Sequence, residues 1–338
     1  MAVVINTNVD SLRVQKNLTN ATSNLSKAME RMSTGLKVLN AKDDAAGTVI
    51  ASRMKVQMDG NQIAQHNVQN ATALLATAEG HLDVVEDNLS RIRDLTLQAR
   101  NGTYSQEEKQ AMQDEVHQRI LEINRISDSS KYSALKLFGD KELDSDGKPK
   151  TDGEGNPILQ NLAKDGGTFQ VGANATEENR ITASADLFQS VRFIDLVTSK
   201  NNDGADGGLT STDFDNFKEQ AEVTPADPAD PELDKINGFD IAKLSVGNLD
   251  KAINALDRGL DNLSARRSII GSAMNRLESA LDTLTTQYEN LSSAKSVILD
   301  ADIAQEASNF TQQNILQQVS TSLLAQANQA PSIALSLI

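Results

Sequence analysis

The chain has 338 residues, no cysteine, 3% aromatic residues and a formal net charge of −15. Without cysteine it cannot form a disulfide, a thiolate metal site or a cysteine nucleophile. The negative charge argues against nucleic acid or an anionic membrane as the main partner. So few aromatic residues favour slim helical layers held together by aliphatic side chains over a thick globular core.

The first residues do not resemble a targeting segment. Residues 1–10 lack the basic and apolar regions of a secretory signal peptide. No apolar run in the chain approaches the roughly 18 residues that span a bilayer, so we expect no membrane insertion. From these features alone the sequence predicts a soluble, cytoplasmic protein.

A first helix is predicted up to Ser33-Thr34-Gly35, where the glycine favours a helix end. Apolar residues recur in it at steps of three and four, which is the spacing of a coiled-coil seam. The members of this seam are Val14, Leu18, Ala21, Leu25, Ala28 and Met32.

Two more helices are predicted before residue 130. The second begins near Asp43-Asp44, because carboxylates suit a helix N-terminus, and ends at Asn101-Gly102. Ser105 to Glu108 form a capping box that opens the third, which runs to about Ser127. Residues 131–138 fit a short strand or hairpin edge. The seam of the second helix consists of Val68, Ala71, Leu75, Ala78, Leu82, Val85, Leu89 and Ile92.

The middle third differs in composition from both flanks. Residues 139–240 hold five of the six prolines and 11 of the 19 glycines. They also hold 22 acidic and 9 basic residues, a net charge of −13, so nearly all the excess charge of the chain lies there. These features predict an acidic, partly β insertion that is looped out from the helical flanks.

The C-terminal third has the most regular seam. Its 14 positions are Ile253, Leu256, Leu260, Leu263, Arg267, Ile270, Met274, Leu277, Leu281, Leu284, Tyr288, Leu291, Lys295 and Ile298. All are apolar or Tyr except Arg267 and Lys295, and the segment would form a rod of roughly 70 Å. A further apolar stripe follows in Ile303, Phe310, Leu316, Val319 and Leu323.

The predicted fold class is mainly α. Because an apolar seam must pack against another helix, the N- and C-terminal flanks are expected to pair with each other. The long N- and C-terminal helices pair as a coiled-coil bundle, and the middle holds a mixed, β-containing insertion. Each terminal seam is short and Ala-rich, and it buries too little area alone to offset its ordering entropy. We therefore expect the terminal helices to be disordered alone and to fold only on assembly with other chains, which would need both ends. Residues 142–236 interrupt neither seam, so we expect them to be dispensable for such assembly. The terminal assembly residues predicted are Leu18, Leu25, Met32, Phe310, Leu316 and Leu323.

Several short motifs at both ends carry a resemblance. Residues 28–47, Ala-Met-Glu-Arg-Met-Ser-Thr-Gly-Leu-Lys-Val-Leu-Asn-Ala-Lys-Asp-Asp-Ala-Ala-Gly, closely resemble the signature of the bacterial flagellins. Residues 5–8 resemble the start of those proteins, and residues 300–302, 315–318 and 324–329 resemble their C-terminal motifs. Met32, Thr34 and Tyr132-Ser133-Ala134 depart from the usual pattern. None of these departures removes an apolar seam position.

The resemblance implies a division into domains. Residues 1–42 and 300–338 would form the inner core of a filament, and residues 43–139 and 240–299 an outer coiled-coil core. Residues 140–239 would be a hypervariable, surface-exposed domain. The seam residues of the outer core would be Leu256, Leu263, Ile270, Leu277, Leu284, Leu291 and Ile298.

The resemblance also implies a function. The chain would be a structural subunit, not an enzyme, that polymerises with itself into the extracellular flagellar filament without cofactor or metal. It would leave the cell unfolded through the flagellar type III export apparatus, with an export chaperone and without a cleaved signal peptide. This replaces the cytoplasmic expectation. Flagellar cap and hook-associated proteins would be further partners.

Recognition by the host Toll-like receptor for flagellin is implied at Arg91, Leu95 and Glu115. Arg91 and Leu95 lie four residues apart on one helix face, and Ile92 belongs to the inward seam. We therefore expect Arg91 and Leu95 to point partly outward. The simpler alternative is that Arg91 only forms a solvated helix pair with Asp94.

Two other functions stay open at the level of sequence. A hook–filament junction protein belongs to the same superfamily and has similar ends. An enzyme or adhesin grafted into the middle third would need catalytic groups, yet residues 139–240 contain neither His nor Cys. His66, His81 and His117 do not form the His-Glu-x-x-His motif of zinc peptidases.

Overall fold

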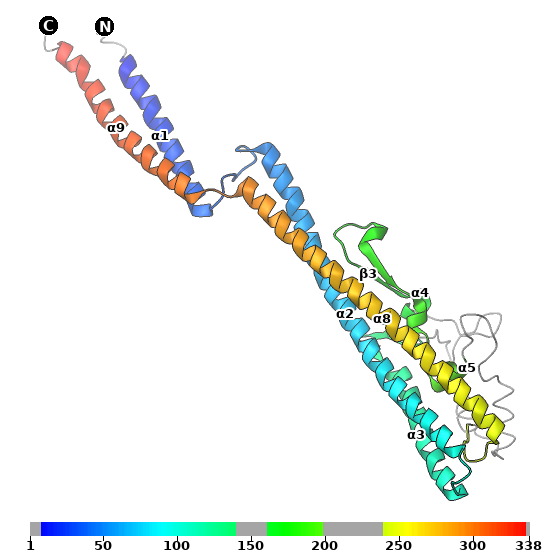
Figure 1. The fold of residues 1–338 in the computed structure, drawn as a ribbon. Coiled ribbons are helices and arrows are strands. Elements are labelled where there is room, and N and C mark those ends of the chain that lie inside the picture. Colours follow the sequence, from blue (N-terminus) through cyan, green and yellow to red (C-terminus); the bar gives the residue numbers. More distant parts are fainter. Residues whose placement is uncertain (1–7, 140–160, 199–238, 336–338) are drawn as a thin grey trace. The chain divides into compact units, whose positions relative to one another are not determined.

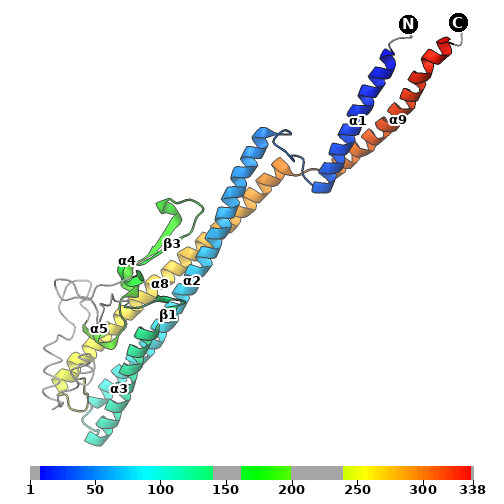
Figure 2. The ribbon, with the colours of Figure 1, turned by 180° about the vertical axis from the view of Figure 1, so that it is seen from behind.

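The structure is a computed structural model that describes residues 8–139, 161–198 and 239–335. It confirms the mainly α fold, with long helices at both ends of the chain that pack against each other (Figures 1 and 2). The long helices are α1 (Val9–Thr34), α2 (Ala45–Ala99), α3 (Gln106–Ser129), α8 (Val246–Leu299) and α9 (Ile303–Leu335).

The chain divides into two compact units, and the boundary between them falls within α2 and within α8. Unit 1 comprises residues 1–62 and 285–338, and unit 2 comprises residues 63–284. None of the described helices is long and apolar enough to cross a membrane. The finer division predicted at residues 42, 139, 239 and 299 stays a prediction.

The predicted helix ends have clear local causes. Asn8 caps α1 by accepting a hydrogen bond from the Ser11 N–H at 3.0 Å, and α1 ends at Gly35, whose φ of 73° suits glycine. The capping box of α3 is confirmed, because the Ser105 Oγ accepts from the Glu108 N–H and Glu108 Oε2 accepts from the Ser105 N–H. Asp44 accepts from the Gly47 N–H at 2.9 Å at the start of α2.

In unit 1, α1 and α9 lie side by side. The segments that lead into and out of them are joined by main-chain hydrogen bonds. Ala301 N–H donates to the Gly35 carbonyl at 2.9 Å, and Lys37 N–H donates to the Leu299 carbonyl at 2.6 Å. Leu36 and Asp300 form a bridge of β type between these hydrogen bonds. The segment between α1 and α2 and the segment between α8 and α9 are therefore held together.

The core of unit 2 lies between α2, α3 and α8. All eight residues of the predicted seam of α2 are buried, and five of the seven named seam residues of α8, Leu256, Leu263, Ile270, Leu277 and Leu284, are buried as well. Gly259 allows close packing at this seam, since a Cβ there would lie 3.0 Å from Leu89 Cδ2. Leu291 and Ile298, which fall in unit 1, are only half-buried.

The middle third is less separate than the sequence predicts. Its described part contains α4 (Asn161–Asp165), β3 (Gly167–Gln170), η1 (Glu177–Asn179), β4 (Arg180–Ala183), η2 (Ala185–Phe188) and α5 (Phe193–Thr198). β3 and β4 pair antiparallel, with Thr168 opposite Thr182.

A smaller hairpin, β1 (Lys131–Tyr132) with β2 (Leu135–Lys136), confirms the hairpin predicted in residues 131–138. Residues 140–160 and 199–238 lie outside the described residues.

Residues 161–198 are part of the core of unit 2, which contradicts the prediction that all of 140–239 is a surface-exposed insertion. Phe188, Phe193 and Val197 are fully buried in the same cluster as the seams of α2 and α8. The Phe193 ring also packs edge-on against Phe239, with 5.2 Å between the ring centroids. Averaging composition over the whole window concealed the short apolar run from Leu187 to Val197.

Candidate assembly and recognition surfaces

The inner face of α1 is the apolar face that its sequence predicts. Ala21 and Ala28 are buried, and Leu18, Leu25 and Met32 are half-buried. Small residues at the most buried positions let the helices approach closely but bury little area. This face therefore contributes only modest hydrophobic stabilisation to the α1–α9 pair.

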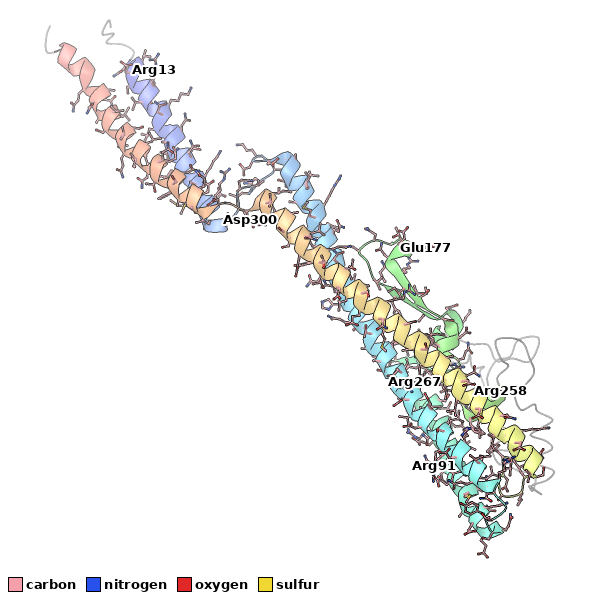
Figure 3. The ribbon with its side chains drawn as sticks, in the orientation of Figure 1. Arg13, Arg91, Glu177, Arg258, Arg267 and Asp300 are labelled. Carbon is pink, nitrogen blue, oxygen red and sulfur yellow. The ribbon has the colours of Figure 1, made fainter. Side chains whose placement is uncertain are left out.

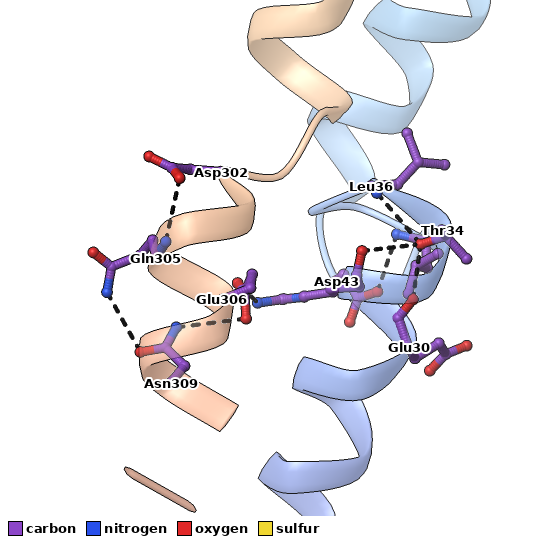
Figure 4. Close-up of polar contacts among 10 residues, drawn as sticks. Glu30, Thr34, Leu36, Asp43, Asp302, Gln305, Glu306 and Asn309 are labelled. Atoms are coloured by element: carbon purple, nitrogen blue, oxygen red, sulfur yellow. Dashed lines mark hydrogen bonds and ion pairs between the residues drawn. The ribbon is translucent and has the colours of Figure 1, made fainter. Parts of the chain in front are cut away.

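The face of α9 that meets α1 is largely polar. Its ion pair joins Glu306, which is 8% exposed, to Arg31 at 3.2 Å (Figure 4). Further along, Gln317 Nε2 donates to Thr22 Oγ1 at 3.3 Å, and Asn8 Nδ2 donates to the Ala327 carbonyl at 2.7 Å. Polar pairing of this kind specifies an alignment more than it stabilises a helix pair, because each hydrogen bond replaces one to water.

The apolar residues of α9 lie mainly on its outer face. Of the predicted stripe, Phe310 is half-buried, whereas the other four members are between 44% and 48% exposed: Ile303, Leu316, Val319 and Leu323. Ile315 adds to this exposed set. Leu316 and Leu323 are therefore not buried against α1, and their role in assembly stays a prediction. Periodicity shows that a helix has an apolar face, but it does not show which neighbour covers that face.

The residues around the Arg31–Glu306 pair are held by helix caps and tight turns (Figure 4). Asp302 Oδ1 accepts from the Ala304 N–H at 2.9 Å and so begins α9. Asp43 Oδ2 accepts from the N–H groups of Leu39 and Asn40 in the linker before α2. These contacts give the linker between α1 and α2 a defined turn.

A charged patch joins α2 to α3 in unit 2. Arg91, marked in Figure 3, donates from Nε and Nη2 to the two carboxylate oxygens of Glu115, at 2.9 and 3.2 Å. Arg119 donates to the same carboxylate at 3.0 Å and to Asn88 Oδ1 at 3.1 Å. The hydrogen bond from Arg91 is the main reason that the pKa of Glu115 is lowered. The structure thus brings Arg91 and Glu115 together.

Leu95 does not belong to this exposed patch. It is 2% exposed and lies in the core with Ile92, so the expectation that it points partly outward is wrong. In unit 2, α2 packs against both α3 and α8, and its buried stripe is therefore wide enough to include the adjacent residues Leu95 and Thr96. Arg119 and Asn88 are members of the patch that sequence reasoning missed. The spacing of Glu115 and Arg119, four residues apart on α3, was the available signal.

Both ends of the chain match family models of known proteins. Residues 5–142 match the bacterial flagellin N-terminal helical region, and residues 253–338 match the bacterial flagellin C-terminal helical region. A flagellin of Serratia marcescens is 39% identical, with both chains covered along their full length. The chain belongs to the bacterial flagellin family.

Other flagellins are similar over equally long alignments. Flagellin 1 of Proteus mirabilis is 36% identical and polar flagellin F of Vibrio parahaemolyticus is 32% identical, each over the full length of both chains. A solved structure of a flagellar hook-associated protein from Vibrio parahaemolyticus is 15% identical, with a TM-score of 0.51. It covers 76% of this chain and 99% of its own, and it shows a shared fold. As a flagellin, the chain is a structural component of the flagellar filament.

Proposed function

We propose that this flagellin polymerises through its terminal helices, and that the exposed apolar side chains of α9 are buried against other copies of the chain. The observation that carries the proposal is the outer set Ile315, Leu316, Val319 and Leu323, of which each is between 44% and 55% exposed. A contiguous apolar surface on an otherwise polar helix marks an interaction site. In a flagellar filament the neighbours of each subunit are other copies of the chain, so we assign this surface to them.

The polar character of the α1–α9 contact supports the same proposal. Helix pairing inside one chain leaves the aliphatic side chains of α9 in water, so the isolated pair is weakly stabilised. Burial on assembly would remove that apolar area from water. Folding of the terminal helices would therefore be coupled to polymerisation.

A double substitution on the outer face tests the proposal. Leu316→Gln with Leu323→Gln keeps two good helix formers but removes apolar area, and we expect seeded polymerisation to be lost. The matched control is Thr321→Gln with Ala325→Gln, two exposed positions on the opposite flank of the same helix, which should polymerise like the parent. Filament yield is measured by sedimentation and electron microscopy. Normal filaments from the Leu316/Leu323 variant would contradict the proposal.

The proposal includes the route to the filament. The chain leaves the cell unfolded through the flagellar type III export apparatus, with an export chaperone, and meets cap and hook-associated proteins at the growing end. The lack of cysteine suits this route, because no disulfide can trap the unfolded chain. If the chain were instead a hook–filament junction protein, it would be only a trace component of sheared filaments. Abundance in sheared filaments separates the two, since a filament subunit dominates such a preparation.

Recognition by the host Toll-like receptor is proposed for Arg91 and Glu115, without Leu95. The supporting observation is that the two charges form one ion-paired patch with side chains about two-fifths exposed, at 42% and 36%. Arg91→Ala should lower the potency of the monomer about tenfold or more in receptor reporter cells. Arg125→Ala, which removes another exposed Arg–Glu pair of unit 2, is the control. Unchanged potency of the Arg91 variant would exclude this assignment.

A further inference from the structure

The apolar seams of α2 and α8 do not by themselves fix how far one helix is slid along the other. Each seam repeats every seven residues, so a slide of one heptad again places apolar side chains opposite one another. At 1.5 Å per residue, such a slide moves one helix by about 10 Å. To fix the register of α2 against α8, unit 2 therefore requires interactions that do not repeat every seven residues.

Arg267 is the residue of unit 2 that interrupts the seam of α8. Its Nη2 lies 2.9 Å from Glu79 Oε1 and 2.9 Å from Asp83 Oδ1, and its Nη1 lies 2.7 Å from Glu86 Oε2. All three carboxylates belong to α2, and Figure 3 marks Arg267 on α8. Hydrogen bonds to Glu86 and Glu79 raise the pKa of Arg267. Arg267 therefore supplies the positive charge at these three carboxylates.

Two more ion pairs cross from α2 to α8. Arg93 Nε pairs with Asp257, and Arg100 Nε lies 2.6 Å from Asp250 Oδ1. A step of one heptad forward on α2, from Arg93 to Arg100, corresponds to one heptad backward on α8, as antiparallel helices require. Along α2 the charge facing α8 is therefore negative around Asp83 and positive from Arg93 onward. Along α8 the signs are opposite.

If α8 slides by one heptad so that Asp250 faces Arg93, that one ion pair forms again, but the rest of the match is lost. Asp257 would face Glu86 instead of Arg93, which places two carboxylates opposite each other. Arg267 would move opposite Ala76 and lose most of its carboxylate partners. Like charges across a coiled coil oppose pairing, and an Arg at an apolar seam position is costly without its partners.

A slide in the other direction is no better. Arg267 would move opposite Ser90, where it would keep Glu86 but meet the cation Arg93 in place of its other two carboxylates. Asp257 would face Arg100. Asp250 would pass beyond Ala99, where α2 ends, and would lose its partner. Only the observed register satisfies all three groups of charges.

We infer that Arg267 and its three carboxylates, flanked by the two Arg–Asp pairs, fix the register of α2 against α8 in unit 2. The apolar seams supply the attraction and the charges select one alignment. A single polar residue at a seam position has this effect in other coiled coils. It follows that replacing Arg267 changes which alignments are populated, whatever it does to stability.

The absence of cysteine allows a direct test. Val84→Cys and Ser279→Cys introduce two spin-label sites at exposed positions of α2 and α8. Pulsed electron paramagnetic resonance on the parent should give one distance between the labels. Arg267→Glu should add a second population displaced by about 10 Å, which is one heptad. Arg267→Met, which keeps an apolar side chain in the seam, should add the same population even where its thermal melt matches that of the parent.

Arg276→Glu is the matched control, because it makes the same charge change at an exposed position of α8. It should leave the single distance unchanged. If both Arg267 variants are folded by circular dichroism and give only the distance of the parent, the inference is overturned. The apolar core, with α3 packed on it, would then set the register alone.

Discussion

Leu284 shows what one buried position contributes. It is 4% exposed and lies in the core of unit 2, whereas the neighbouring Thr283 is exposed. An unpaired carboxylate in the apolar seam costs several kcal/mol, because it loses its hydration without gaining a partner. A change at an exposed site is usually within about 0.5 kcal/mol.

We therefore expect Leu284→Asp to lower the thermal midpoint far more than Thr283→Asp does. Unfolding by heat and by urea, followed by circular dichroism, measures both variants against the parent. Equal midpoints for the two variants would mean that the seam of α8 has a different register from the one described.

Glu115 makes a prediction about pH. Its pKa is lowered in the folded chain, chiefly by the hydrogen bond from Arg91. A carboxylate with a lowered folded pKa stabilises the protein above its unfolded pKa of about 4.3, and this contribution is lost as pH falls through the folded pKa. Because the side chains of both partners are more than a third exposed, the contribution is small.

Glu115→Gln should therefore lower the thermal midpoint slightly at pH 7, and the difference from the parent should shrink as the pH approaches 3. The Arg91→Ala background is the control, since removing the main partner should reduce the effect of Glu115→Gln. A difference that stays constant from pH 7 to pH 3 would argue against the ion pair as its source.

At the scale of elements, the segment from α4 to α5 is held by polar as well as apolar contacts. Arg192 forms two hydrogen bonds with Asp128 of α3, at 3.2 and 2.7 Å. Arg266 of α8 donates to the Gln189 carbonyl at 3.1 Å. Burial lowers the pKa of Arg266, which is consistent with a guanidinium enclosed between α8 and this segment.

Replacing residues 199–238 by a short Gly/Ser linker should therefore preserve the melt of unit 2, because Val197 and Phe239 at its ends stay in the core. Replacing 142–236 should unfold unit 2, because it removes Phe188, Phe193 and Val197 from the core, which revises the expectation that residues 142–236 are dispensable. Phe193→Ala alone should cost about 3–5 kcal/mol, since it empties a fully buried ring site. Urea unfolding of the three variants tests this. A parent-like melt after loss of 142–236 would show that residues 161–198 are not needed for the core.

At the scale of the whole chain, both termini contribute to one pair of helices in unit 1. Neither α1 nor α9 has a large apolar contact with the other, because the α9 face toward α1 is mostly polar. Removal of residues 1–35 or of residues 305–338 should therefore abolish filament formation, while unit 2 keeps its thermal melt. Electron microscopy and calorimetry distinguish these results from general misfolding. Normal filaments from either truncation would contradict the role proposed for the terminal helices.

Features that depend on neighbouring residues could be predicted from the amino-acid sequence. The Ser105–Glu108 capping box, the glycine end of α1 and the hairpin at residues 131–138 involve groups a few residues apart, so local patterns suffice to predict them. Heptad spacing gave the apolar faces of α1, α2 and α8 for the same reason. The short motifs at both ends were sufficient to identify the flagellin family.

Which neighbour each helix face contacts became clear only from the three-dimensional packing. Leu95 is buried because α2 packs between two helices, and Leu316 is exposed because α9 turns a polar face toward α1. The burial of Phe188 depends on the path of residues 161–198 across unit 2. The charges that Arg267 meets depend on the register of α2 against α8. These outcomes depend on contacts between residues far apart in the chain, and no local periodicity specifies such contacts.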